Sequence, residues 1–66
     1  MNNQEQFEKQ YLLIKQEIQK FDVISAGTIQ KHYPMSYPLA NVVIQRLLAE
    51  DIIEPLPDVY DYAVIK

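Results

Sequence analysis

Residues 36–47 read SYPLANVVIQRL, a stretch with the features of a helix that begins at Ser36. The Ser36 hydroxyl can accept a hydrogen bond from a free amide of the first turn, and Pro38 is tolerated there because first-turn amides have no helical partner. Apolar residues recur at helical spacing to about residue 51, at Ala40, Val43, Ile44, Leu47 and Leu48. The stretch therefore predicts a helix with one buried side, whose single basic residue is Arg46.

Two helices are predicted before this one. The first, from about residue 3 to 20, is indicated by an apolar stripe of Phe7, Tyr11, Ile14, Ile18 and Phe21. The second is short. It can be capped by Ser25, and it should end at Tyr33 because Pro34 disfavours helical geometry in the residue before it. Residues 1–4 are expected to be flexible.

The residues after the third helix favour a β-hairpin. Ile52 and Ile53 are β-branched, and residues 55–58 supply turn chemistry through two prolines and Asp58. The run 59–65 favours a strand, in which alternation puts Tyr60, Tyr62 and Val64 on one face. We therefore predict one domain over residues 1–66, of the α+β class and mainly α: a winged helix-turn-helix of three helices and a two-stranded C-terminal wing.

Composition limits the compartment and the partners. The 66 residues carry a net charge of -3, 48% of them are hydrophobic, and none is cysteine, so the core must form without disulfides or zinc thiolates. No apolar run approaches the roughly 18 residues of a membrane span, and the first residues lack the apolar segment of a signal peptide. We expect a soluble, cytoplasmic protein that has no membrane partner.

Catalytic and metal-binding patterns are absent from the sequence. His32 is the only histidine, and no Ser/His/Asp or Cys/His set exists. Gly27, the lone glycine, cannot form a phosphate-cradling loop, and the acidic residues near the C-terminus lack the spacing of a calcium loop. We expect no enzymatic activity, no cofactor, no metal and no small-molecule substrate.

Residues 24–55, ISAGTIQKHYPMSYPLANVVIQRLLAEDIIEP, resemble the C-terminal gamma domain of FtsK/SpoIIIE-type DNA translocases. This likeness extends over about residues 7–66. The resemblance implies a winged helix that reads the DNA sequences orienting translocation, and so a place in DNA-handling machinery. The shared positions are Ile24-Ser25, Ile29-Gln30, Tyr37, Ala40, Ile44, Leu47, Ile52-Ile53 and Pro55.

The chain departs from this family on the surface that contacts DNA. The family carries Asn-Arg after the tyrosine and another arginine three residues later, where this chain has Pro38, Leu39 and Val42. The wing, usually basic, reads Val-Tyr-Asp-Tyr over 59–62, and Asp51 replaces the glycine that ends the third helix. Leucine and valine can neither read guanine nor bind phosphate, so the family's usual contacts to DNA are missing.

These departures favour a non-enzymatic interaction module that contacts a protein partner or a second copy of itself through the third helix and the wing. The partner would belong to replication, segregation or mobile-element machinery, as the resemblance implies. Leu39 and Val42 could form an exposed patch, or a slightly rotated helix could bury them. The residues expected to make the contact are Leu39, Val42, Arg46, Tyr60 and Tyr62.

The alternative hypothesis is a duplex-binding domain of modest affinity and some sequence dependence. Asparagine and glutamine can read adenine with two hydrogen bonds, so the loss of arginines does not exclude it. Its candidate residues are Lys31, His32, Asn41, Gln45 and Arg46. Mimicry of DNA by acidic charge is a weaker hypothesis, because nine acidic residues against six basic ones is a mild bias.

Overall fold

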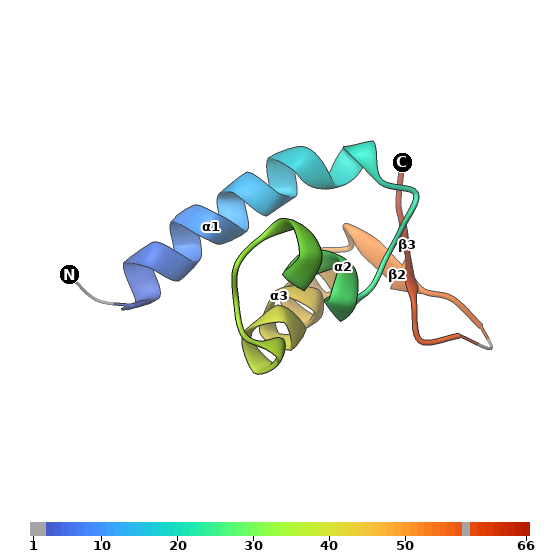
Figure 1. The fold of residues 1–66 in the computed structure, drawn as a ribbon. Helices are drawn as coiled ribbons and strands as arrows, with labels where there is room; N and C mark the ends of the chain where they lie inside the picture. The colour runs from blue at the N-terminus through green and yellow to red at the C-terminus, as the bar shows by residue number, and fades with distance from the viewer. Residues whose placement is uncertain (1–2, 58) are drawn as a thin grey trace.

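The computed structural model describes residues 3–57 and 59–66, and it shows a small, mainly helical α+β domain (Figure 1). The helices are α1 (Asn3–Glu17), which continues as the 3-10 turn η1 (Ile18–Lys20), α2 (Ala26–His32) and α3 (Tyr37–Ala49). The strands are β1 (Val23–Ile24), β2 (Ile53–Pro55) and β3 (Tyr62–Val64). The three predicted helices are confirmed.

Two predictions concern residues at the edge of the described part. Flexibility was expected for residues 1–4, of which 1 and 2 lie outside the described residues, whereas Asn3 and Gln4 belong to the first turn of α1. The turn residue Asp58 also lies outside them. In Figure 1 the first turns of α1 extend past the other elements, and the C-terminus lies near the opposite end of this helix.

The sheet has three antiparallel strands in the order β1-β3-β2. The central strand β3 pairs with β2 through Ile53 opposite Val64, and with β1 through Ile24 opposite Tyr62. The prediction of a two-stranded wing was therefore wrong in its strand count. A strand of two residues between η1 and α2 is too short to show an alternating pattern, and only its pairing with β3 identifies it.

The core lies between the three helices and the inner face of the sheet. Ile44 and Leu47 of α3 are buried in one cluster with Ile14 and Ile18, as predicted. The other members of the cluster are Tyr11, Ile24, Ile29, Tyr33, Ala40, Val43, Ile53 and Val64. Each helix therefore contributes one apolar side, which is how a chain without cysteine can bury a core at this size.

Side-chain caps begin both shorter helices. Ser25 Oγ accepts from the Thr28 amide at 3.2 Å, and Thr28 Oγ1 accepts in return from the Ser25 amide at 3.2 Å, which forms a capping box. Ser36 Oγ accepts from the Leu39 amide at 3.3 Å at the start of α3. The two predicted caps are confirmed.

The end of α3 adopts a Schellman motif around Asp51. The Asp51 amide donates to the Leu48 carbonyl at 3.1 Å, and the Ile52 amide donates to the Leu47 carbonyl at 3.0 Å. Asp51 has φ 59°, the left-handed conformation that glycine adopts at lower cost. An aspartate therefore occupies a position suited to glycine, at the point where the chain leaves α3 and turns towards β2.

None of the helices in the described ranges combines the length and the apolar character that crossing a membrane would require.

Candidate functional site

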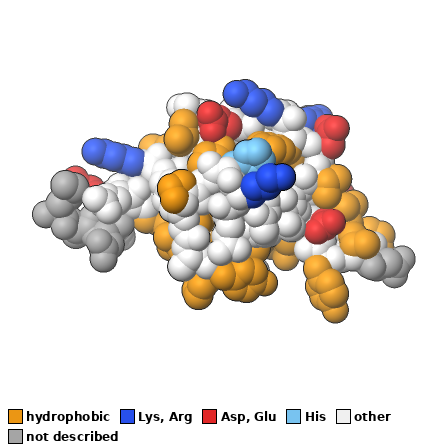
Figure 2. All heavy atoms as spheres, viewed as in Figure 1, with side chains coloured by type: hydrophobic (Ala, Val, Ile, Leu, Met, Phe, Trp, Pro, Cys, Tyr) orange, Lys and Arg blue, Asp and Glu red, His pale blue; other side chains and the backbone are white. Residues whose placement is uncertain are grey.

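The outer face of α3 is uncharged. Burial of Ala40, Val43, Ile44 and Leu47 fixes the inner side of the helix, and at 3.6 residues per turn the remaining positions point away from the core. Within α3, all of whose residues the structure describes, the exposed positions are Tyr37, Pro38, Val42, Gln45 and Ala49. Figure 2 shows hydrophobic side chains along the lower edge of the molecule, where α3 lies in Figure 1.

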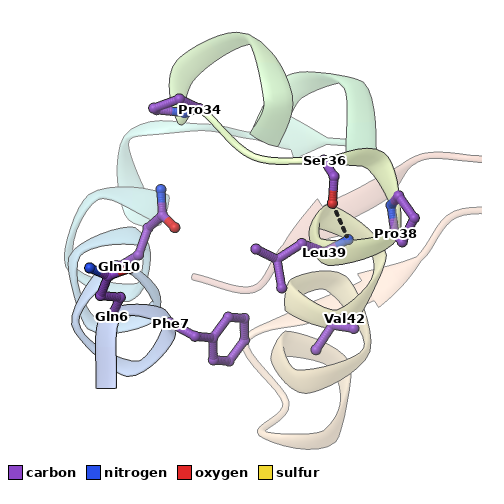
Figure 3. Close-up of a pocket in the computed structure, with 8 residues that line it drawn as sticks. All are labelled: Gln6, Phe7, Gln10, Pro34, Ser36, Pro38, Leu39 and Val42. Carbon is purple, nitrogen blue, oxygen red and sulfur yellow. Dashed lines mark hydrogen bonds between the residues drawn. The ribbon is translucent and has the colours of Figure 1, made fainter. Parts of the chain in front are cut away.

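A hollow of ≈ 600 Å³, which we call the α1–α3 groove, borders this face on the side of α1. Figure 3 shows Phe7 pointing from α1 towards Val42, with Leu39 beside it. Val42 is 50% exposed and Leu39 is half-buried. The two residues therefore form part of one groove wall. The full lining is Gln6, Phe7, Gln10, Pro34, Ser36, Pro38, Leu39 and Val42.

Arg46, the only basic residue of α3, is paired with other residues of the same chain. Its guanidinium donates twice to the Glu8 carboxylate, with Nη2 at 3.0 Å from Oε1, and its Nε lies 3.5 Å from Glu50 Oε2. The guanidinium also lies over the Tyr11 ring, 4.4 Å from its centroid. A partner or a phosphate that bound Arg46 would have to compete with two carboxylates already in place.

Lys15 and Tyr11 complete this cluster, which we call the Arg46 clasp: Glu8, Tyr11, Lys15, Arg46 and Glu50. Lys15 Nζ and the Tyr11 hydroxyl both donate to Glu50 at 2.8 Å. The Arg46 hydrogen bond lowers the pKa of Glu8, and the Lys15 and Tyr11 hydrogen bonds lower the pKa of Glu50. Because these hydrogen bonds favour the ionised form of both carboxylates, the clasp is suited to holding α1 on α3.

The predicted wing tyrosines take different positions. Tyr62 belongs to β3 and packs against the core, on the same side of the strand as Val64. Tyr60 precedes the strand and is 99% exposed. The shared face predicted from alternation therefore holds for Tyr62 and Val64 and is wrong for Tyr60, because the hairpin loop continues past residue 60.

A second hollow, of ≈ 320 Å³, lies on the other flank of α3, and we call it the α3–hairpin hollow. Tyr37 and Asn41, four residues apart on α3, form one wall. The full lining is Ser25, Ala26, Gly27, Tyr37, Asn41, Tyr60, Asp61 and Tyr62. The sequence does not indicate that Tyr37 lies near the wing. The four-residue spacing of Tyr37 and Asn41 places them on one side of α3, but only the fold brings the hairpin to that side.

The candidate DNA-contacting residues do not form one surface. Asn41 and Gln45 lie one turn apart on α3, and Arg46 belongs to the clasp. His32, at the end of α2, packs edge-on against Phe21, with 5.1 Å between the ring centroids, and lines a different hollow with Glu17 and Lys20. Lys31 beside it is exposed. The neighbouring Tyr33 hydroxyl donates to Glu17 at 2.5 Å, and burial together with this bond raises the Tyr33 pKa to about 12.

Within residues 3–57 and 59–66, no group of three or more His, Cys, Asp or Glu side chains is placed to hold a metal ion. In comparisons with known proteins, no family model matches the chain, and neither a curated protein nor a solved structure matches it significantly. The resemblance to translocase gamma domains therefore depends only on the residues compared in the sequence.

Proposed function

We propose that the chain is a non-enzymatic winged-helix interaction module that contacts a protein partner, or a second copy of itself, through α3 and the wing. The order α1-β1-α2-α3-β2-β3, with β1 paired to the C-terminal hairpin, supports the winged-helix assignment. The observation that carries the function is the outer face of α3, which exposes Val42 and no charged residue while Arg46 is paired with Glu8. Exposed apolar surface of this kind marks interaction sites.

The resemblance supplies the setting. Pro38, Leu39 and Val42 stand where the translocase family has its polar DNA-reading residues, and they line the α1–α3 groove. Surface positions that contact DNA in that family are therefore apolar in this chain, and they line a groove. We place the partner in cytoplasmic DNA replication, segregation or mobile-element machinery.

Duplex binding is the second candidate, and the adjacent side chains of Asn41 and Gln45 favour it because both can read adenine. Phosphate contacts would have to come from elsewhere, since residues 47–65 contain no Lys or Arg and include Asp61 in the wing. Phosphate neutralisation supplies most non-specific affinity. We therefore expect no measurable binding of a random duplex at physiological salt in a gel-shift titration, and saturable, salt-sensitive binding at micromolar concentration would reverse the ranking.

The protein-contact hypothesis is tested with Val42→Arg, and Gln16→Arg on the exposed side of α1 is the matched control. Both are surface substitutions, so the free energy of unfolding should change by about 0.5 kcal/mol or less. An arginine at position 42 would have to be buried unpaired in an apolar interface, which is strongly unfavourable. Val42 alone is changed because the half-buried Leu39 could affect folding.

The readouts are sedimentation of the purified chain and recovery of proteins from cell extract, identified by mass spectrometry. We expect self-association or a recovered protein with the wild type and Gln16→Arg, and its loss with Val42→Arg. Because Val42→Arg restores an arginine found in the translocase family, its duplex binding is measured alongside. Equal recovery by both variants, or recovery of DNA alone, would overturn the proposal.

A further inference from the structure

The α3–hairpin hollow combines aromatic rings with a carboxylate. Tyr37 of α3 is 58% exposed and Tyr60 of the hairpin loop is 99% exposed, so both rings are presented to solvent at its edges. Tyr62 and Asp61 are half-buried in its lining. Figure 2 shows hydrophobic side chains projecting at the end of the molecule that carries the hairpin in Figure 1.

Four polar side chains of this lining keep their hydrogen-bonding capacity. In the part of the chain that the structure describes, the side chains of Tyr37, Tyr60, Asp61 and Tyr62 make no hydrogen bond or ion pair with other residues. The carboxylates of the Arg46 clasp, in contrast, are paired with Lys15 and Arg46. The Asp61 carboxylate is therefore available to a cation from outside the molecule.

The charge around the hollow favours a cation over an anion. The chain has a net charge of -3, and residues 47–65 contain five carboxylates and no Lys or Arg. The start of α2 also borders the hollow, but Ser25 Oγ already accepts from the Thr28 amide there, so this amide is not free for a phosphate. Both the net negative charge of the chain and the Asp61 carboxylate in the hollow therefore attract a cation.

We propose that the α3–hairpin hollow binds an arginine side chain from an extended, basic segment of the partner. The guanidinium is planar, so it can stack on the exposed Tyr60 ring while it donates to the Asp61 carboxylate. Tyr and Arg are also the residues enriched at the centres of protein interfaces. This inference rests on the proposed function, because it names the partner's chemistry on the hairpin side of the same surface.

The test is an NMR titration of the isotope-labelled chain with a short peptide of alternating glycine and arginine. Peptides with lysine or glutamate in place of arginine are run in parallel. We expect the arginine peptide to shift the signals of Tyr37, Asn41 and residues 60–62, the lysine peptide to bind more weakly, and the glutamate peptide not to bind. Added salt should weaken the arginine complex.

Two pairs of variants separate the site from general electrostatic attraction. Tyr60→Ala is compared with Val59→Ala, an exposed neighbour that does not line the hollow. Asp61→Asn is compared with Glu54→Gln, an exposed carboxylate on β2. Loss of a cation–π contact worth about 0.5–2 kcal/mol predicts roughly 2- to 30-fold weaker binding for Tyr60→Ala, and Asp61→Asn should also weaken binding while the controls match the wild type.

Equal weakening by Asp61→Asn and Glu54→Gln, or unchanged binding by Tyr60→Ala, would overturn the inference. The proposed function fails separately, by the comparison of Val42→Arg with Gln16→Arg, because Val42 lines the α1–α3 groove and not this hollow. Partner loss with Val42→Arg together with no arginine-peptide binding would refute the hollow alone. Site-specific peptide binding together with partner capture that Val42→Arg leaves intact would support the hollow and refute the role of the outer face.

Discussion

Truncation of Ile44 to alanine tests whether α3 is oriented as described. Ile44 is 1% exposed and belongs to the core cluster formed with α1. The change removes three carbon atoms, worth about 2.4 kcal/mol at ~0.8 kcal/mol each, and the cavity left behind brings the expected loss to about 2–5 kcal/mol. A 66-residue domain is stable by only about 3–10 kcal/mol at ~0.05–0.15 kcal/mol per residue, so Ile44→Ala should be close to unfolding.

Urea denaturation followed by circular dichroism measures this loss, and two variants calibrate it. Ile44→Val removes one methyl group and should cost about 0.5–1.5 kcal/mol. Val42→Ala lies two residues away on the same helix but at a position that is 50% exposed, so its cost should stay near ~0.5 kcal/mol. The slope of the unfolding free energy against urea concentration should be the same for all variants. A shift in the midpoint of denaturation then reports a change in stability alone.

The order of the three variants carries the result. If Ile44→Ala and Val42→Ala cost the same, or if Val42→Ala costs more, the buried side of α3 is not the one that contains Ile44. The outer face would then be assigned incorrectly, and the proposed interaction surface would be refuted together with it.

Two further predictions concern the C-terminal end of α3 and the ion pairs that link α3 to α1. Asp51→Gly should raise the free energy of unfolding by about 1 kcal/mol and the melting temperature by about 4–8 °C. Glycine suits the left-handed conformation at this position, and the change also removes a negative charge from a helix C-terminus. A melting temperature by calorimetry that is unchanged or lower would contradict this prediction. The pKa values of Glu8 and Glu50 lie below their ordinary 4.5, so their stabilisation is present above pH 4.5 and is lost as pH falls through the folded-state pKa values. Glu8→Gln should flatten this acid-side loss in melts at a series of pH values, whereas an unchanged profile would show that the Arg46 pair contributes nothing.

The sequence predicted the helices well because the determinants of each helix are local. Ser25 and Ser36 cap the helices that follow them, and the apolar spacing of α3 identified Ile44 and Leu47 as core. The third strand was missed for a physical reason. Val23–Ile24 is a strand only because β3, almost forty residues later, offers its backbone for pairing, and two residues carry no periodic pattern of their own.

The candidate site was predicted less completely, because its geometry depends on contacts between distant elements. Leu39 and Val42 are neighbours from their spacing alone, but the groove beside them exists because Phe7 of α1 forms the facing wall. In the same way, Tyr60 lines the same hollow as Tyr37 and Asn41 only through the path of the hairpin. Helical spacing supplies one wall of each hollow, and tertiary structure supplies the other.

Arg46 shows why this difference affects the function. Its pairing with Glu50 follows the i,i+4 spacing and is visible in the sequence, whereas its pairing with Glu8 joins residues 38 positions apart. If Arg46 turned outward to a phosphate, Glu8 would lose its cation, and Glu8 and Glu50 would stand near the bound anion and repel it. A protein partner that packs on the uncharged face of α3 needs no such rearrangement, since the clasp stays closed behind it. The internal pairing of the one basic residue of α3 is therefore a physical reason to rank protein contact above duplex binding.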